Sequence, residues 1–356
     1  MRNILTVIGA RPQFVKAATL SRQFTLCGIK EQIIHTGQHF DSNMSDVFFE
    51  EMAIPKPAYH LDINGVTHGA MTGRMLEGIE HILLKDKPEG VLVYGDTNST
   101  LAGALAAVKL NIPVIHVEAG LRSFNMAMPE EINRILTDRI SNLLLCPTDT
   151  AVQNLKREGF DAYPVQIVKN GDVMQDAALY YAQKAQEKSR IISQLGLTDF
   201  VLATIHRQEN TDDSVKLQEI ISGLNKINKE VQVVVPLHPR TRNILQQMNL
   251  QPAFTIIDPV GYFDMIMLLK HCKLVVTDSG GVQKEAFFFG KHCITLREQT
   301  EWVELVQHGY NRIVGTNPNL LLDAFQFFSN RQSVFSVDLY GNGRAAEVAA
   351  KEIGKM

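Results

Sequence analysis

The sequence predicts an α/β fold built from two doubly wound halves. Short apolar, β-branched runs recur at intervals too long for hairpins, and stretches of helical periodicity lie between them. The chain of 356 residues is long enough for two domains, and a hydrophobic content of 45% is ample for two cores. Each half is therefore predicted to be an open parallel sheet of six strands that helices cover on both faces.

Two series of six apolar runs define the predicted strands. The first series spans residues 4–8, 32–36, 91–94, 114–117, 143–146 and 165–168, and the second spans 200–205, 231–236, 254–257, 274–277, 293–296 and 312–314. The Asn170-Gly171 turn signal separates the series, so we predict domains at 1–169 and 170–340 that meet at a cleft. A helical pattern follows at about 341–356, and periodicity leaves open whether it packs back onto the first domain.

The charge balance excludes several classes of partner. The 35 basic and 38 acidic side chains leave a formal charge of −3, so we expect no nucleic-acid partner and no membrane surface. No run of eighteen uncharged apolar residues occurs, and the N-terminus leads directly into a strand pattern, so we expect a soluble cytoplasmic protein. The four cysteines lack Cys-x-x-Cys spacing, which favours buried reduced thiols over a zinc site.

Parallel sheets bind ligands beyond the carboxyl ends of their strands, so the residues after each strand are the candidates for a site. The first strand leads into Gly9-Ala10-Arg11-Pro12-Gln13-Phe14-Val15-Lys16. Arg11 and Lys16 place two cations at a helix start, a position suited to an anion, although a solvated basic turn is the alternative. The segment has neither the Gly-x-Gly-x-x-Gly pattern nor a Walker loop, so we expect no nucleotide cofactor.

A second glycine-rich turn, Asp278-Ser279-Gly280-Gly281, follows the strand predicted at 274–277. Paired glycines at a helix start let backbone N–H groups approach a diphosphate, and Glu285 lies one turn later, where it suits ribose hydroxyls. The pattern indicates a nucleoside-diphosphate site. The alternative is an ordinary helix N-cap by Ser279.

Three carboxylates lie at or just after strand ends in the first half. Asp96 follows residues 91–95, Glu118 ends the strand at 114–117, and Glu130 is expected in a loop before a helix at 132–140. Because strand ends converge on the cleft, we expect these groups to lie close together and to act as proton donors and acceptors. The alternative is that Asp96 and Glu130 cap helices.

Two histidines near strand ends of the second half extend the candidate set. His206 follows the strand at 200–205 and is placed to stabilise a departing diphosphate, although a lone histidine there is more often structural. His238 follows the strand at 231–236 and is counted among the substrate-binding residues. The histidines lack His-x-x-x-His spacing, so we expect no metal site.

These motifs resemble those of the non-hydrolysing UDP-N-acetylglucosamine 2-epimerases, in the same order along nearly the whole chain. They are Gly9-Ala10-Arg11-Pro12, His35-Thr36-Gly37-Gln38-His39, Gly95-Asp96-Thr97, His116-Val117-Glu118-Ala119-Gly120-Leu121-Arg122, Pro129-Glu130-Glu131-Ile132-Asn133-Arg134 and Thr277-Asp278-Ser279-Gly280-Gly281. The resemblance implies the two-domain fold called GT-B and a homodimer. It assigns acid/base work to Asp96, Glu118 and Glu130, and the departing diphosphate to His206. It places Arg11, Lys16, Ser279, Gly280 and Gly281 on phosphate oxygens, and Glu285 on the ribose.

The chain is more similar to one branch of this family. Ala10 and Gln13-Phe14 replace residues typical of the N-acetylglucosamine enzymes, and segments 278–291 and 299–304 resemble the 2-epimerases of UDP-2,3-diacetamido-2,3-dideoxy-glucuronic acid. Those enzymes supply lipopolysaccharide O-antigen synthesis. Trp302 stands where the N-acetylglucosamine enzymes commonly have a diphosphate-binding arginine. The resemblance thus implies an isomerase of the glucuronic acid derivative.

The chemistry of such a sugar favours elimination of UDP. Carbon 2 carries an N-acetyl group and no adjacent carbonyl, so loss of its proton alone leaves an unstabilised carbanion, whereas elimination to a glycal followed by re-addition avoids it. Four alternatives stay open: UDP-N-acetylglucosamine as substrate, a GT-B glycosyltransferase, a hydrolysing epimerase, and a UDP-sugar-binding protein without chemistry. Arg122, Arg134 or a backbone nest are the candidates for holding a uronate carboxylate.

Overall fold

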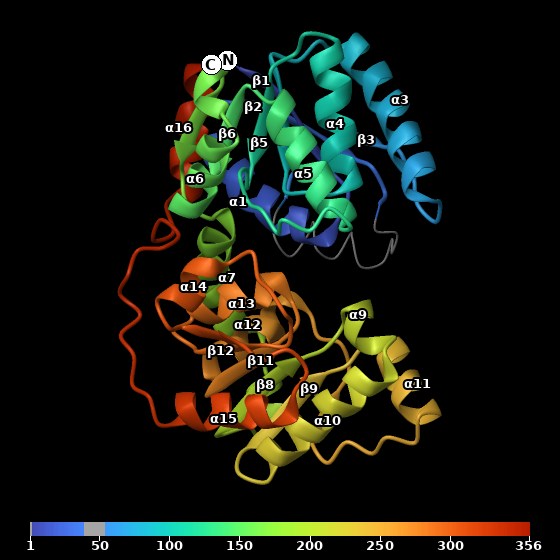
Figure 1. Cartoon of the computed structure of the whole chain (residues 1–356). Coiled ribbons are helices and arrows are strands. Elements are labelled where there is room, and N and C mark those ends of the chain that lie inside the picture. Colours follow the sequence, from blue (N-terminus) through green and yellow to red (C-terminus); the bar gives the residue numbers. More distant parts are fainter. Residues whose placement is uncertain (1, 39–53) are drawn as a thin grey trace. The chain divides into compact units, whose positions relative to one another are not determined.

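The computed structural model describes residues 2–38 and 54–356, so His39 of the motifs above lies outside the described residues. The chain forms two compact units, Met1–Ala177 with Asp338–Met356, and Ala178–Val337 (Figure 1). Each unit contains its own parallel sheet, which confirms the predicted fold class. The domain bounds expected from the sequence stay a prediction.

The first unit contains a parallel sheet with the strand order β3-β2-β1-β4-β5-β6-β7. Its strands are β1 (Asn3–Ile8), β2 (Lys30–His35), β3 (Tyr59–His60), β4 (Gly90–Tyr94), β5 (Val114–Val117), β6 (Leu143–Cys146) and β7 (Gln166–Lys169). The expected six strands are present, and β3 is a seventh that the sequence analysis missed because two residues give no periodic signal. The order reverses between β1 and β4, so the loops after these strands flank the crevice where such sheets bind ligands.

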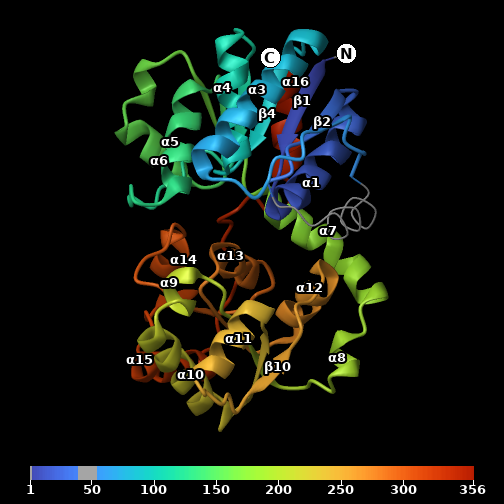
Figure 2. The same ribbon diagram turned by 90° about the vertical axis from the view of Figure 1, so that its right-hand side faces the viewer.

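Helices cover the first sheet, as the fully buried strands β4, β5 and β6 require (Figure 2). They are α1 (Arg11–Cys27), α3 (His68–Asp86), α4 (Asn98–Lys109), α5 (Pro129–Ile140), α6 (Asp149–Arg157), the short 3-10 helix Phe160–Ala162, α7 (Val173–Lys188) and α16 (Ala345–Lys355). α4 packs against α3 and α5, and α1 packs against α16. α7 begins in the first unit and ends in the second.

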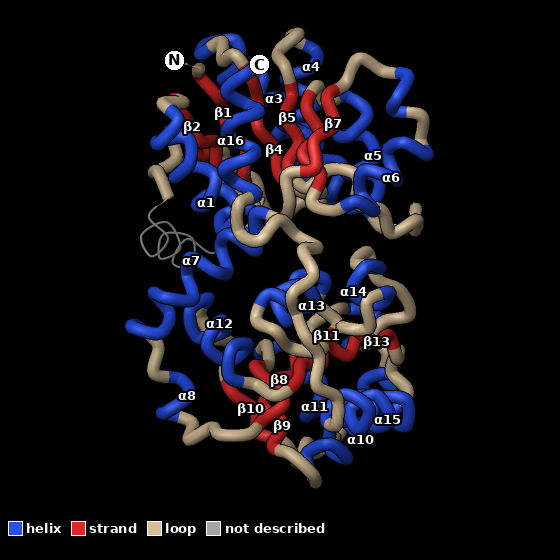
Figure 3. The backbone as a smooth tube through the Cα atoms, turned by 90° about the vertical axis from the view of Figure 1, so that its left-hand side faces the viewer, coloured by secondary structure: helices blue, strands red, loops and turns tan. Residues whose placement is uncertain are grey.

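The second unit contains a parallel sheet with the order β10-β9-β8-β11-β12-β13, in which all six expected strands are present (Figure 3). The strands are β8 (Phe200–Thr204), β9 (Gln232–Pro236), β10 (Thr255–Ile257), β11 (Leu274–Thr277), β12 (Cys293–Thr295) and β13 (Asn311–Ile313). The helices are α8 (Ile191–Gln194), α9 (Gln208–Thr211), α10 (Ser214–Asn228), α11 (Pro239–Gln247), α12 (Tyr262–His271), α13 (Gly280–Phe288), α14 (Val303–Gln307) and α15 (Pro318–Ser329). The order reverses between β8 and β11, so the loops after these two strands flank its crevice.

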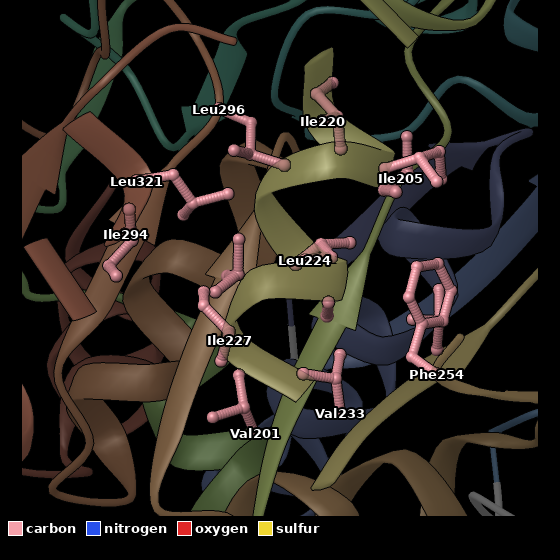
Figure 4. Packing of buried hydrophobic residues seen from close by; sticks show 14 of the residues in the cluster. Val201, Ile205, Ile220, Leu224, Ile227, Val233, Phe254, Ile294, Leu296 and Leu321 are labelled. Carbon is pink, nitrogen blue, oxygen red and sulfur yellow. The ribbon is translucent and has the colours of Figure 1, made fainter. Parts of the chain in front are cut away.

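The core of the second unit shows how sequence periodicity anchors a helix. Ile220, Leu224 and Ile227 recur at helical spacing on α10 and are fully buried over the sheet, beside Val201 and Val233 (Figure 4). Burial of each such side chain contributes about 1.5–3 kcal/mol. This packing holds the sheet rigidly beneath the loops that carry the candidate residues.

The C-terminal segment is fixed to the first unit by polar contacts. The Asp176 carboxylate accepts hydrogen bonds from the N–H groups of Ala345 (3.0 Å) and Ala346 (2.8 Å), which caps α16. Gly171 has φ of 92°, and a Cβ there would overlap the carbonyl oxygen of Tyr340. A glycine is therefore required at the turn that the sequence analysis identified.

Two expectations from composition have definite outcomes. Among the described residues, no helix is both long enough and apolar enough to cross a membrane.

Cys146, Cys272 and Cys293 are buried thiols, as expected. Cys27 is exposed, contrary to expectation, because it lies in the last turn of α1.

Candidate functional site

The first cluster lies where β4 and β5 end. The Lys16 ammonium pairs with the Glu118 carboxylate, and the two side chains are only 9% and 11% exposed. Gly95, with φ of 63°, lies beside this pair, since a Cβ there would be 3.2 Å from Glu118 Oε2 and 3.6 Å from Lys16 Nζ. The structure thus brings Lys16 and Glu118 together next to the residue that precedes Asp96.

Asp96 is held from α5. Its Oδ2 pairs with the Arg134 guanidinium, which also pairs with Glu131, and Asn133 Nδ2 donates to the Asp96 carbonyl oxygen at 2.9 Å. The Asp96 side chain is 31% exposed, so it remains accessible to a ligand. The cap of α4 is Thr97, whose hydroxyl accepts from a backbone N–H in the first turn, so Asp96 is not a helix cap.

Glu130 lies in the first turn of α5, and the expectation that it occupies a loop is wrong. The helix begins at Pro129 because proline presets the φ angle of a first helical residue. Met128 is the N-cap, so Glu130 is not a cap, and its side chain is exposed. Glu130 precedes Arg134 by one turn and therefore shares a helix face with the residue that contacts Asp96.

Gln13 connects the turn after β1 to the loop after β4. Its side-chain oxygen accepts from the N–H groups of Gly9 (2.8 Å) and Ala10 (3.0 Å), and its nitrogen donates to the carbonyl oxygen of Tyr94 at 2.8 Å. The same nitrogen lies 3.0 Å from each of two threonine hydroxyls at the N-terminus of α4. The sequence analysis noted Gln13 without giving it a role. The side chain of Arg11 lies outside the described part of the structure.

The second cluster lies after β8 and β11. His206 is two residues beyond β8, and its Nδ1 is 3.0 Å from Asp278 Oδ1. Asp278 Oδ2 accepts from the backbone N–H groups of His206 and Arg207, each at 3.1 Å. Burial alone would raise the pKa of Asp278, but hydrogen bonding and the charge of His206 lower it below its ordinary value. The His206 side chain is 54% exposed, so its Nε2 edge is available to an anion.

The helix α13 begins directly after Asp278. Ser279 is its N-cap and accepts from the Val282 N–H at 3.4 Å, which confirms the capping alternative without excluding a bound phosphate. Gly281 is exposed, so its N–H can approach a ligand. A Cβ at Gly280 would overlap the Glu301 carboxylate, so a side chain at this position would displace Glu301. Glu285 lies one turn into the helix and is buried.

His238 and Trp302 are the remaining candidates of the second unit. His238 is the N-cap of α11, and its Nδ1 accepts from the Arg240 N–H at 3.2 Å. Trp302 is buried, and the Lys284 ammonium lies 4.3 Å from the centre of its ring. A cation therefore lies beside the position that the family resemblance associates with an arginine.

Arg122 is unsuited to hold a substrate carboxylate. Its buried guanidinium donates to Asp138 Oδ2 at 2.7 Å and, through two nitrogens, to Glu158 at 2.7 and 2.8 Å. The sequence analysis missed Asp138 and Glu131 because both lie inside an amphipathic helix, where a charged residue predicts a solvated face. Over residues 2–38 and 54–356, no group of three histidine, cysteine or acidic side chains could hold a metal ion.

The two clusters suit different chemistry. Carboxylates at strand ends can accept and return protons, and the Asp96 side chain, at 31% exposed, is open to a ligand. A half-exposed imidazole beside a glycine-rich helix N-terminus suits an anion. The cluster of the first unit is therefore suited to proton transfer, and the cluster of the second unit is suited to phosphate binding.

Comparison with known proteins agrees with these capacities. A family model described as UDP-N-acetylglucosamine 2-epimerase matches residues 25–354. The chain is 56% identical to UDP-2,3-diacetamido-2,3-dideoxy-D-glucuronate 2-epimerase of Pseudomonas aeruginosa, over 99% of each chain. It is 33% identical to UDP-N-acetylglucosamine 2-epimerase of Escherichia coli over 96% of each chain. The crystal structure of the Methanocaldococcus jannaschii UDP-GlcNAc 2-epimerase with UDP-GlcNAc and UDP matches with a TM-score of 0.89 and 41% identity, over 100% of this chain and 99% of that one.

A match over more than nine-tenths of the chain, together with a relative at 56% identity, decides the family. The chain belongs to the UDP-N-acetylglucosamine 2-epimerase family of non-hydrolysing UDP-sugar 2-epimerases.

Proposed function

We propose that this protein inverts carbon 2 of UDP-2,3-diacetamido-2,3-dideoxy-D-glucuronate to the manno configuration. The observation that carries the proton chemistry is the placement of Asp96 and Glu118 around Gly95, each paired with a cation. The choice of sugar is supported by the relative of that name, which is 56% identical over 99% of both chains.

In the proposed reaction, a carboxylate removes the proton of carbon 2 while the bond between carbon 1 and the diphosphate oxygen breaks. The electron pair of the C–H bond forms the double bond of a glycal, and the oxygen keeps the pair of the broken bond, so UDP leaves as an anion. Re-addition of UDP to carbon 1, with protonation of carbon 2 on the opposite face, completes the inversion. No net oxidation or hydrolysis occurs.

The roles follow from the two clusters. Asp96, Glu118 and Glu130 are proposed as the acid/base groups, and Lys16 forms an ion pair with Glu118. His206, held by Asp278, is proposed to stabilise the departing diphosphate, and the N-terminus of α13 from Ser279 to Gly281 to bind its oxygens. Arg11 is proposed for the same anion, Glu285 for the ribose and His238 for the nucleotide.

A second candidate substrate is UDP-N-acetylglucosamine. It is favoured by relatives with that name, including the Methanocaldococcus jannaschii protein at 42% identity over 96% of both chains. The two sugars differ at carbons 3 and 6, where the glucuronate derivative carries an acetamido group and a carboxylate.

The test is a comparison of kcat/KM for the two UDP-sugars, with the epimer identified by the coupling constants of the sugar ring. We expect kcat/KM for the glucuronate derivative to exceed that for UDP-N-acetylglucosamine by at least about a hundredfold, the size of a well-placed polar recognition contact. A preference for UDP-N-acetylglucosamine would replace the proposed substrate while leaving the reaction unchanged. A homodimer and a role in O-antigen synthesis, which the resemblance implies, and a cytoplasmic location, which the composition predicts, stay predictions.

A further inference from the structure

A buried histidine connects the loops that carry the two paired carboxylates. His116 lies in β5, two residues before Glu118, and its Nε2 is 2.7 Å from the carbonyl oxygen of Gly95, directly before Asp96. Its Nδ1 is 2.7 Å from Asp138 Oδ1 in α5. Both ring nitrogens thus lie within hydrogen-bond distance of oxygen atoms of two other elements.

The second oxygen of Asp138 holds the other side of Glu118. Asp138 Oδ2 accepts from the Gly120 N–H at 3.1 Å and from Arg122 at 2.7 Å. The Asp138 carboxylate therefore contacts both residue 116 and residue 120, which lie two positions before and two positions after Glu118. Between them Glu118 has φ of 72°, a left-handed conformation that a residue with a side chain rarely adopts.

The buried network of His116, Asp138 and Arg122 does more than stabilise the fold. The side chains of His116 and Asp138 are fully buried, and that of Arg122 is 1% exposed. Burial would raise the pKa of Asp138, but hydrogen bonding and charge from His116, followed by Arg122, keep it below its ordinary value. Buried ion networks contribute little net stability compared with apolar residues of similar volume. What this one fixes instead is the backbone on both sides of Glu118 and immediately before Asp96.

We propose that His116 is a positioning residue for the reaction: its contact with the Gly95 carbonyl oxygen holds the loop that carries Asp96 at a fixed distance from Glu118, and Asp138 orients its ring. This inference rests on the acid/base roles proposed for Asp96 and Glu118. It goes beyond them, because neither His116 nor Asp138 is proposed to touch the substrate. The effect should appear in turnover rather than in UDP binding, since misplacement of a reacting group by about 1 Å can cost about a hundredfold.

Two substitutions of His116 separate its two contacts. The side-chain nitrogen of asparagine can occupy the position of the histidine Nδ1. His116→Asn therefore keeps the contact with Asp138 and loses the contact with the Gly95 carbonyl oxygen. The longer amide of glutamine matches Nε2, so His116→Gln keeps the Gly95 contact. His292→Asn and His292→Gln are the matched control, because His292 is a buried histidine of the second unit that hydrogen-bonds Ser333.

Steady-state kinetics and UDP titration are measured for each variant, after thermal unfolding has verified the fold. We expect His116→Asn to lower kcat by about a hundredfold with an unchanged Kd for UDP, His116→Gln to stay within about tenfold of wild type, and both His292 variants to retain turnover. Equal kcat values for the two His116 variants, or a loss that appears only in UDP affinity, would overturn the proposal. If His116→Asn does not fold, the kcat of His116→Gln decides alone. A hundredfold loss of kcat in His116→Gln then counts against the proposal. Wild-type protein that is inactive with every UDP-sugar would instead refute the proposed function.

Discussion

Lys16 and Glu118 form a nearly buried ion pair beside Gly95, although they are 102 residues apart in sequence. Lys16 lies in α1, and Glu118 directly follows β5. Parallel topology makes this possible, because the ends of β1, β4 and β5 lie at one edge of the sheet. Glu118 has φ of 72°, and this left-handed backbone costs about 1–2 kcal/mol. Strain at a paired carboxylate of this kind is typical of a functional site.

The three candidate carboxylates should each be required for turnover. We expect Asp96→Asn, Glu118→Gln and Glu130→Gln to lower kcat at least about a hundredfold, the lower limit for loss of a general acid or base. Each change keeps the size of the side chain and removes its charge. Kinetics with the UDP-sugar measures the loss, and Glu187→Gln, an exposed residue of α7, is the control. Near-normal kcat in all three variants would remove the acid/base assignment.

Gly95 should be required both for its positive φ angle and for the space that a side chain would take beside Glu118. Gly95→Ala and Gly28→Ala both place a side chain at positive φ, 63° and 67°, at a cost of about 1 kcal/mol each. At Gly28 no atom lies within 4 Å of the added Cβ, whereas at Gly95 it would press on the Glu118 carboxylate. We therefore expect similar losses of stability but a fall in kcat of at least about tenfold for Gly95→Ala alone. Equal kcat values in both variants would contradict this expectation.

Gln13 should stabilise the turn after β1. Gln13→Ala leaves buried N–H groups at Gly9 and Ala10 without their acceptor, and a buried polar group without a partner costs about 1–3 kcal/mol. We expect the free energy of unfolding to fall by at least about 2 kcal/mol. Urea unfolding measures the change, and Gln251→Ala, at an exposed position, should stay within about 0.5 kcal/mol of wild type. A loss at Gln13 no larger than that of the control would exclude this role.

Glu31 in β2 should make stability depend on pH. Burial raises its pKa from 4.5 to about 7, against the opposing effect of the nearby Ser21 and Thr6 hydroxyls, of which Thr6 donates a hydrogen bond at 2.5 Å. The folded state then binds the proton more tightly than the unfolded state, so the stabilisation is complete below pH 4.5 and is lost as the pH rises through about 7.

The loss over this range is roughly 3 kcal/mol. We expect Glu31→Gln to match wild type in unfolding free energy near pH 4.5 and to exceed it at pH 8. Urea unfolding at the two pH values measures the difference, with Glu187→Gln as a control that keeps the wild-type slope. An unchanged slope for Glu31→Gln would contradict the raised pKa.

The strand runs and the strand-end carboxylates could be predicted because both are local patterns. Asp96, Glu118 and the Ser279 cap are examples, since each lies within two residues after a recognisable apolar run. The partner of each carboxylate could not be predicted, because the partners of Glu118 and Asp96 come from other elements through tertiary packing. Glu130 was misplaced because its helix begins three residues before the first apolar position.

We propose that a carboxylate of the first unit exchanges the proton of carbon 2 while UDP leaves and returns. This exchange is tested most directly by incubating wild-type protein with the UDP-sugar in deuterium oxide and following carbon 2 by NMR and mass spectrometry. The account predicts one deuterium at carbon 2 of the epimer, with UDP still attached to the sugar at equilibrium. Epimer without deuterium, or accumulation of free sugar and UDP, would contradict it.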